Sequence, residues 1–171
     1  GGNKGMVVMT QQPMGLGLTG QSAEVHFAKV QRVGEKGNCL LMYDSGTQLS
    51  LVSLAYVMRA GLRRIDKSRL EVDVLGGQTQ SYGKYLLVLE DCAGAKHEIL
   101  VRAVAQIGKA YIAKCPDWIG EILPGLEGQE AELTQLPGNV DVMLGLDQVR
   151  YFPVESGRYQ RLTYQVSGFR G

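Results

Sequence analysis

Asp44 is the strongest candidate in this chain for a catalytic residue. It closes the apolar run Cys39–Tyr43 and begins the triplet Asp44-Ser45-Gly46, which is followed by Thr47–Val52. A carboxylate at the end of a strand that otherwise looks buried is costly unless it is used. Gly46 allows a sharp turn, and the hydroxyl of Ser45 can fix that turn. A carboxylate on such a turn is suited to take a proton from water.

A single aspartate is only half of what this chemistry needs. Without a metal or a covalent nucleophile, amide hydrolysis needs one carboxylate as a base toward water and one carboxylic acid toward the carbonyl oxygen. The Asp-Ser/Thr-Gly triplet occurs once, because Asp91 and Asp117 are followed by other residues. The economical solution is a twofold-symmetric homodimer in which two copies of Asp44 meet at the axis.

Hairpins and one short helix are predicted to position Asp44. Alternating apolar residues and turn clusters indicate three hairpins, the first of which delivers its second strand to Asp44. The hairpins cover residues 23–43, 70–83 and 84–104, and the helix covers Leu49–Leu62 and ends at Gly61. A last strand is expected around Leu162–Val166. This pattern predicts an all-β fold with one short helix.

The chain of 171 residues is expected to hold one domain. Residues 1–21 are rich in glycine and glutamine and are interpreted as a flexible arm or linker. Residues 22–171 form the predicted domain, with an insertion at about 105–139 that contains three prolines.

Composition argues against several classes of function. The net charge of +1 gives no field that would attract nucleic acid. No stretch is long and apolar enough to cross a bilayer, and no signal peptide is visible, so a cytoplasmic location is expected. Three widely spaced cysteines and two distant histidines do not suggest a zinc site. The glycines of Gly15–Gly20 match a dinucleotide-binding pattern, but no clear strand precedes them, so a nucleotide-binding domain is a weaker hypothesis.

In the order of its motifs the chain resembles the retroviral aspartic proteases. The triplet comes first, a glycine-tipped hairpin at Leu75-Gly76-Gly77-Gln78 follows, and the run Val140–Gly145 ends in Met143-Leu144-Gly145. The local sequence is most similar to the proteases of BEL/Pao LTR retrotransposons, where Asp-Ser-Gly followed by Ser/Thr-Gln and an apolar helix start is typical. The stretch from Val140 to Asp147 likewise resembles that family's Ile-Asp-hydrophobic-Leu-Ile-Gly-x-Asp. The resemblance covers roughly residues 22–155.

This resemblance implies a retropepsin-like β-barrel half-site that assembles as a symmetric homodimer. By this likeness Asp44 is the catalytic carboxylate, Ser45 fastens the two loops across the dyad, and Gly46 lets the backbone approach closely. Leu75, Gly76, Gly77 and Gln78 form the flap over the substrate. Leu144 and Gly145 support the active loop.

The implied function is that of an aspartic endopeptidase. Its substrate would be an extended polypeptide, and by resemblance the retroelement's own Gag–Pol polyprotein, cleaved in the cytoplasm or inside virus-like particles. No metal or organic cofactor is expected. The alternative is a catalytically inactive module of the same retropepsin fold that serves in dimerisation or peptide binding.

Overall fold

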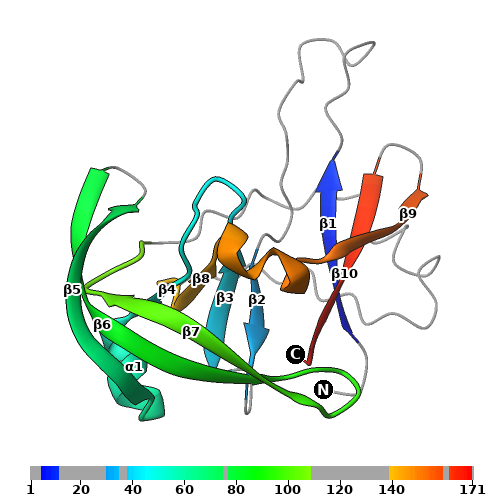
Figure 1. The fold of residues 1–171 in the computed structure, drawn as a ribbon. Helices are drawn as coiled ribbons and strands as arrows, with labels where there is room; N and C mark the ends of the chain where they lie inside the picture. Colours follow the sequence, from blue (N-terminus) through cyan, green and yellow to red (C-terminus); the bar gives the residue numbers. More distant parts are fainter. Residues whose placement is uncertain are drawn as a thin grey trace.

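The computed structural model describes residues 5–11, 30–34, 38–74, 77–108, 139–159 and 162–170, most of which lie in β-strands (Figure 1). The elements in chain order are β1 (Gly5–Gln11), β2 (Val30–Val33), β3 (Cys39–Tyr43), β4 (Leu51–Ser53), α1 (Leu54–Ala60), β5 (Arg63–Val74), β6 (Gly77–Glu90), β7 (Lys96–Val104), β8 (Val142–Leu144), the 3₁₀ segment η3 (Leu146–Tyr151), β9 (Val154–Tyr159) and β10 (Leu162–Arg170). The predominance of β-structure agrees with the expected fold class.

The larger sheet in the described residues has the strand order β2-β3-β8-β4-β7-β6-β5. It is mixed, because β8 runs parallel to β3 and β4 runs parallel to β7, while the other pairs are antiparallel. The strand β8 therefore lies between β3 and β4, although it comes much later in the chain. This insertion brings the end of β8 beside the loop that joins β3 to β4.

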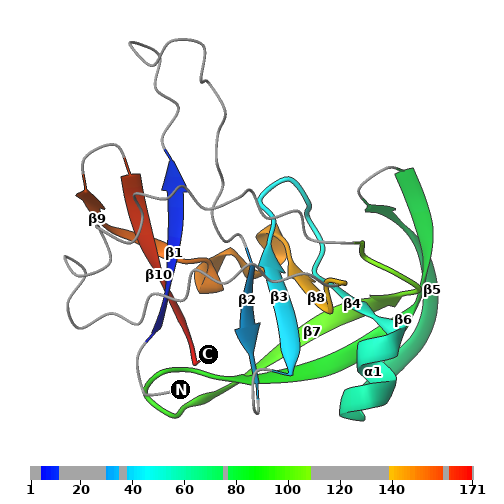
Figure 2. The same ribbon diagram turned by 180° about the vertical axis from the view of Figure 1, so that it is seen from behind.

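A smaller sheet pairs the two ends of the chain in the order β1-β10-β9. It lies beside the larger sheet, on the side opposite the curled ends of β5 and β6 (Figures 1 and 2). A bridge between Asp91 and Phe169, and a hydrogen bond of 2.9 Å from the Cys92 amide to the Gly168 carbonyl oxygen, link the two sheets. Residues 5–11 of the predicted arm thus form a paired strand.

Two groups of buried apolar side chains hold the larger sheet together. One group lies among β3, β6, β7, β8 and α1, and includes Leu41, Leu87 and Ile99. The other contains Leu51, Val72 and Met143. Burying such side chains contributes on the order of 1.5–3 kcal/mol each relative to leaving them in water. Met143, the residue at the centre of β8, lies opposite Met42 of β3 and Leu51 of β4 in the sheet register.

The helix is shorter than the sequence predicted. Of the predicted helix Leu49–Leu62, residues Leu51–Ser53 form β4, and only Leu54–Ala60 are helical. The side chain of Ser53 caps the helix by accepting a hydrogen bond from the Tyr56 amide, and Gly61 ends it in the left-handed conformation. The start of the helix was predicted wrongly because β4 is buried between β7 and β8, and its pairing with these strands overrides helix propensity.

The second and third predicted hairpins are present and share the long strand β6. The pair β6–β7 closes around residues 91–95, and β5–β6 extends well beyond residues 70–83. The last strand is also present, as β10. The predicted strand at 23–28, the glycines of Gly15–Gly20 and residues 109–138 of the insertion lie outside the described residues.

Candidate functional site

Asp44 is placed by the parallel pairing of β3 with β8. In this register Tyr43 is opposite Leu144, and the Asp44 amide donates a hydrogen bond of 2.9 Å to the Leu144 carbonyl oxygen. Parallel strands end at the same edge of a sheet, so the residues that follow them leave the sheet side by side. The pairing therefore puts the triplet that begins with Asp44 next to Gly145.

The loop after β3 is closed by the carboxylate of Asp44 itself. The Gly46 amide donates to Asp44 Oδ1 at 2.8 Å, and the Thr47 amide donates to the Asp44 carbonyl oxygen at 3.4 Å. Aspartate favours such turns because its side chain can replace a backbone acceptor. Asp44 is half-buried, whereas Ser45 and Gly46 are exposed. The carboxylate is thus fixed in direction while its loop faces outward.

Gly145 is the point at which β8 contacts the Asp44 loop most closely. A Cβ atom at this position would lie 2.7 Å from the Leu49 carbonyl oxygen and 2.8 Å from that of Thr47. Side-chain carbons do not approach backbone oxygens so closely, so only glycine fits. The predicted supporting residues Leu144 and Gly145 are both buried and both adjoin the loop.

A pair of polar side chains that were not predicted as site residues, Ser50 and Asp147, also holds this loop. Ser50 is buried, and its hydroxyl donates to Asp147 Oδ1 at 2.6 Å while its amide donates to Asp147 Oδ2 at 3.2 Å. The Gly145 amide in turn donates to Ser50 Oγ at 3.0 Å. The available signal was a serine within an apolar run and an aspartate two residues after Gly145.

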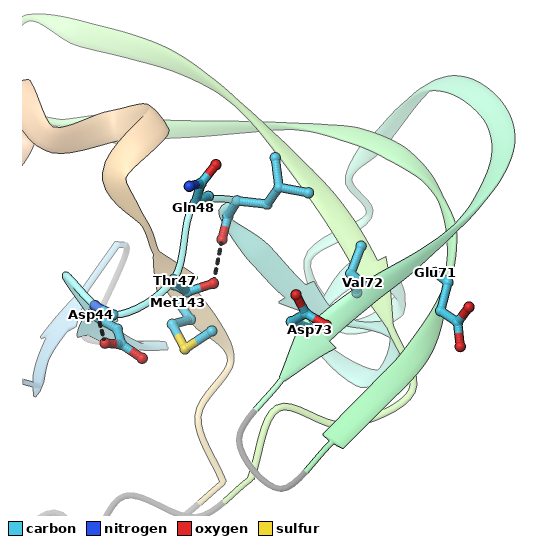
Figure 3. A pocket seen from close by; sticks show the side chains of 9 residues that line it. Asp44, Thr47, Gln48, Glu71, Val72, Asp73 and Met143 are labelled. Carbon is cyan, nitrogen blue, oxygen red and sulfur yellow. Dashed lines mark hydrogen bonds between the residues drawn. The ribbon is translucent and has the colours of Figure 1, made fainter.

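A pocket of about 600 Å³ lies between the Asp44 loop and β5. Figure 3 shows Asp44 on one side of this pocket and the residues of β5 on the other. The lining residues are Asp44, Gly46, Thr47, Gln48, Leu49, Glu71, Val72, Asp73 and Met143. The ionisable side chains among them are three carboxylates. A cationic ligand group would therefore be favoured over an anionic one.

The predicted flap belongs to the hairpin that forms the far wall of the pocket. Leu75 and Gly76 lie outside the described residues. Gly77 and Gln78 begin β6, and Gln78 Nε2 donates to Asp73 Oδ1 at 3.2 Å. Gly77 has φ of +143°, which is strained for residues other than glycine. Of the predicted flap, the structure thus describes two residues, and one of them bonds to a residue that lines the pocket.

The aspartate of the Val140–Gly145 run, Asp141, is buried and has a structural role. Asp141 Oδ2 accepts a hydrogen bond of 2.8 Å from the Leu40 amide and lies 3.0 Å from Arg59 Nη2. These contacts tie β8 to β3 and to α1, and Asp141 is away from the pocket lining. Burial, followed by the charge of Asp141, raises the pKa of the neighbouring Cys39 thiol to about 12, so this thiol is not a nucleophile at neutral pH.

Two features are absent from the described residues. No cluster of three or more histidine, cysteine, aspartate or glutamate side chains is arranged to hold a metal ion there. Neither helical segment in that part of the chain has the length and apolar character needed to cross a membrane.

Comparison with known proteins gave no match. No protein-family profile, no curated protein and no solved structure is significantly similar to the chain.

Proposed function

We propose that this chain is one half of an aspartic endopeptidase that cleaves extended polypeptides. The observation that carries the proposal is the position of Asp44, whose carboxylate is held on a turn beside a glycine-ended strand and lines a pocket walled by a hairpin. A carboxylate in this setting is suited to act as a base toward water. Its half-buried position keeps it accessible to a substrate.

The proposed reaction needs a second carboxylate, and the proposal takes it from a second copy of the chain. Two Asp44 side chains at about 3 Å would share one proton, since two like charges at that distance cannot both ionise cheaply. One would take a proton from water, and the protonated one would donate to the substrate carbonyl oxygen. The retropepsin-like barrel and the symmetric homodimer are parts of this proposal. The chemistry proposed involves no metal and no organic cofactor.

The pocket suits a peptide in extended conformation. It lies between a loop and the strand β5, so a substrate segment there would run alongside main-chain groups of β5. Main-chain hydrogen bonds then give affinity, and alternate side chains give selectivity. The retroelement polyprotein, as substrate, and the cytoplasm or a virus-like particle, as location, stay predictions from the resemblance.

The test is cleavage of a peptide library from acid to neutral pH by the wild type and by Asp44→Asn. The variant keeps the shape of the side chain but removes the carboxylate, so we expect the rate to fall at least about 100-fold. Asp66→Asn is the matched control, because Asp66 lies on β5 outside the pocket lining and should leave the rate unchanged. Equal rates for wild type and Asp44→Asn would refute the proposal.

The second candidate function is peptide binding or dimerisation without catalysis. One observation favours it: a single copy of the chain already provides the pocket, whereas it provides only one Asp44 carboxylate. Sedimentation and peptide-binding measurements on the wild type distinguish the two candidates. A dimer that binds peptides and cleaves none at any pH would support the binding module.

A further inference from the structure

We infer that Ser50 and Asp147 are positioning residues that hold the Asp44 loop in the geometry needed for the reaction, an inference that rests on the proposed function. They are 97 positions apart in the sequence, and they meet where the loop after β3 contacts the first turn of η3. Neither lines the pocket, so their effect on the reaction would pass through the loop.

The contacts between these residues form a closed ring. The Gly145 amide donates to Ser50 Oγ, the Ser50 hydroxyl donates to Asp147 Oδ1, and the Ser50 amide donates to Asp147 Oδ2. The distances are 3.0, 2.6 and 3.2 Å. The Gly145 amide can only donate and an ionised carboxylate can only accept, so within this ring the Ser50 hydroxyl must donate its proton to Asp147. The ring therefore needs a carboxylate at position 147.

An asparagine at position 147 cannot replace the carboxylate. It offers one oxygen and one NH₂ group, whereas Ser50 presents two donors, its amide and its hydroxyl. Either the NH₂ group faces the Ser50 amide, or the hydroxyl proton loses its acceptor. Because Ser50 is only 1% exposed, water cannot easily restore the lost bond.

The ring is joined to the part of the loop that lines the pocket. The Leu146 amide donates to the Thr47 carbonyl oxygen at 2.9 Å, and the Asp147 amide donates to that of Gln48 at 3.0 Å. Thr47 and Gln48 both line the pocket, and Thr47 also bonds back to Asp44. A shift of η3 relative to Ser50 would therefore move the segment that sets the direction of the Asp44 carboxylate.

The experiment compares kcat and KM for Ser50→Ala, Asp147→Asn and the double variant with the wild type. We expect each single change to lower kcat by about 10- to 100-fold with a smaller change in KM, because small displacements of reacting groups are costly to the rate. The double variant should be no slower than the worse single variant, since both break one ring. Ser50→Thr keeps the hydroxyl and should restore most of kcat.

Ser53→Ala is the matched control for loss of a buried serine hydroxyl. Ser53 is also buried, and its hydroxyl oxygen accepts one hydrogen bond, from the Tyr56 amide, which the alanine would remove. This bond caps α1 and does not involve the Asp44 loop. We expect Ser53→Ala to lower the unfolding midpoint while keeping kcat, and Ser50→Ala, which removes two hydrogen bonds, to lower both. If Ser50→Ala and Asp147→Asn lower kcat no more than Ser53→Ala does, the inference is wrong.

Hydrogen exchange separates this inference from the proposed function. The Gly46 amide donates to Asp44 and the Leu146 amide donates to Thr47, both in the Asp44 loop, so both amides should exchange faster in Asp147→Asn and stay protected in Ser53→Ala. If these amides exchange faster in Asp147→Asn but the wild type cleaves no peptide, the two residues do hold the loop and the chain is not a protease. Unchanged exchange together with an active wild type would overturn the positioning role and keep the protease.

Discussion

Replacing Gly145 with alanine tests the contact on which the site depends. The added Cβ would lie 2.7 Å from the Leu49 carbonyl oxygen, and ordinary contact begins at 3.4 Å, so the loop must move by about 0.7 Å. Both nearby atoms belong to the backbone and cannot rotate away as the end of a side chain would. The strain must therefore be relieved by moving β8 or the Asp44 loop.

The expected cost can be worked out from the contacts that would be disturbed. Overpacking of this kind costs about 1–3 kcal/mol. The movement would also stretch the hydrogen bonds from the Leu146 amide to Thr47 and from the Gly145 amide to Ser50, each of which contributes about 1 kcal/mol. We expect Gly145→Ala to lower the free energy of unfolding by about 2–4 kcal/mol, a large part of the roughly 5–15 kcal/mol typical of a domain.

Urea unfolding at a fixed protein concentration measures this loss. A loss of this size would lower the urea midpoint by about 1–2 M. Gly168→Ala is the control, because a Cβ there meets no atom within 4 Å and should leave the midpoint almost unchanged. Gly46→Ala gives a useful contrast, because its Cβ would meet the movable side chain of Asp44, with Oδ1 at 3.1 Å. This substitution should lower activity more than stability. Equal midpoints for Gly145→Ala and Gly168→Ala would refute the reasoning.

Three further predictions follow from charges and burial. Peptides that place lysine rather than glutamate near β5 should show a kcat/KM about fivefold higher, and Glu71→Gln combined with Asp73→Asn or added salt should remove the preference. The hydrogen bond from His97 lowers the pKa of Asp91, so the ionised Asp91 carboxylate stabilises the fold, and this stabilisation should be lost as the pH falls below about 4. The free energy of unfolding of Asp91→Asn should therefore change less with pH in the acid range than that of the wild type. Cys39, whose pKa burial raises to about 12, should resist thiol reagents at neutral pH until the protein unfolds, as mass spectrometry of labelled peptides would show.

Strands with clear ends could be predicted from the sequence. An apolar run bounded by turn residues gave the bounds of β3 correctly, and the third predicted hairpin ends where β7 ends, at residue 104, because local patterning and turn chemistry agree there. The same logic placed Asp44 directly after a strand and Gly145 at the end of an apolar run. That these two strands are hydrogen-bonded neighbours depends on long-range pairing, which only the structure describes.

Features that depend on distant partners could not be predicted from local patterns. Ser50 looks like an ordinary residue of the predicted helix Leu49–Leu62, and Asp147 is recognisable only as the last residue of a motif, with no local sign of its partner. Their role appears only when β8 is inserted between β3 and β4 and brings them together. The pocket-lining role of Glu71 and Asp73 depends likewise on how far β5 extends over the loop.

The position of β8 in the sheet affects when a working site first exists during synthesis. The ribosome releases β3, the Asp44 loop and β4 well before β8, so during that interval the strand that separates β3 from β4 is absent. Contacts between segments far apart in the chain also form slowly. In the proposed protease, the Asp44 loop of a nascent chain would lack its contacts with β8 until Gly145 has been added. This delay would protect the growing chain from being cleaved too early.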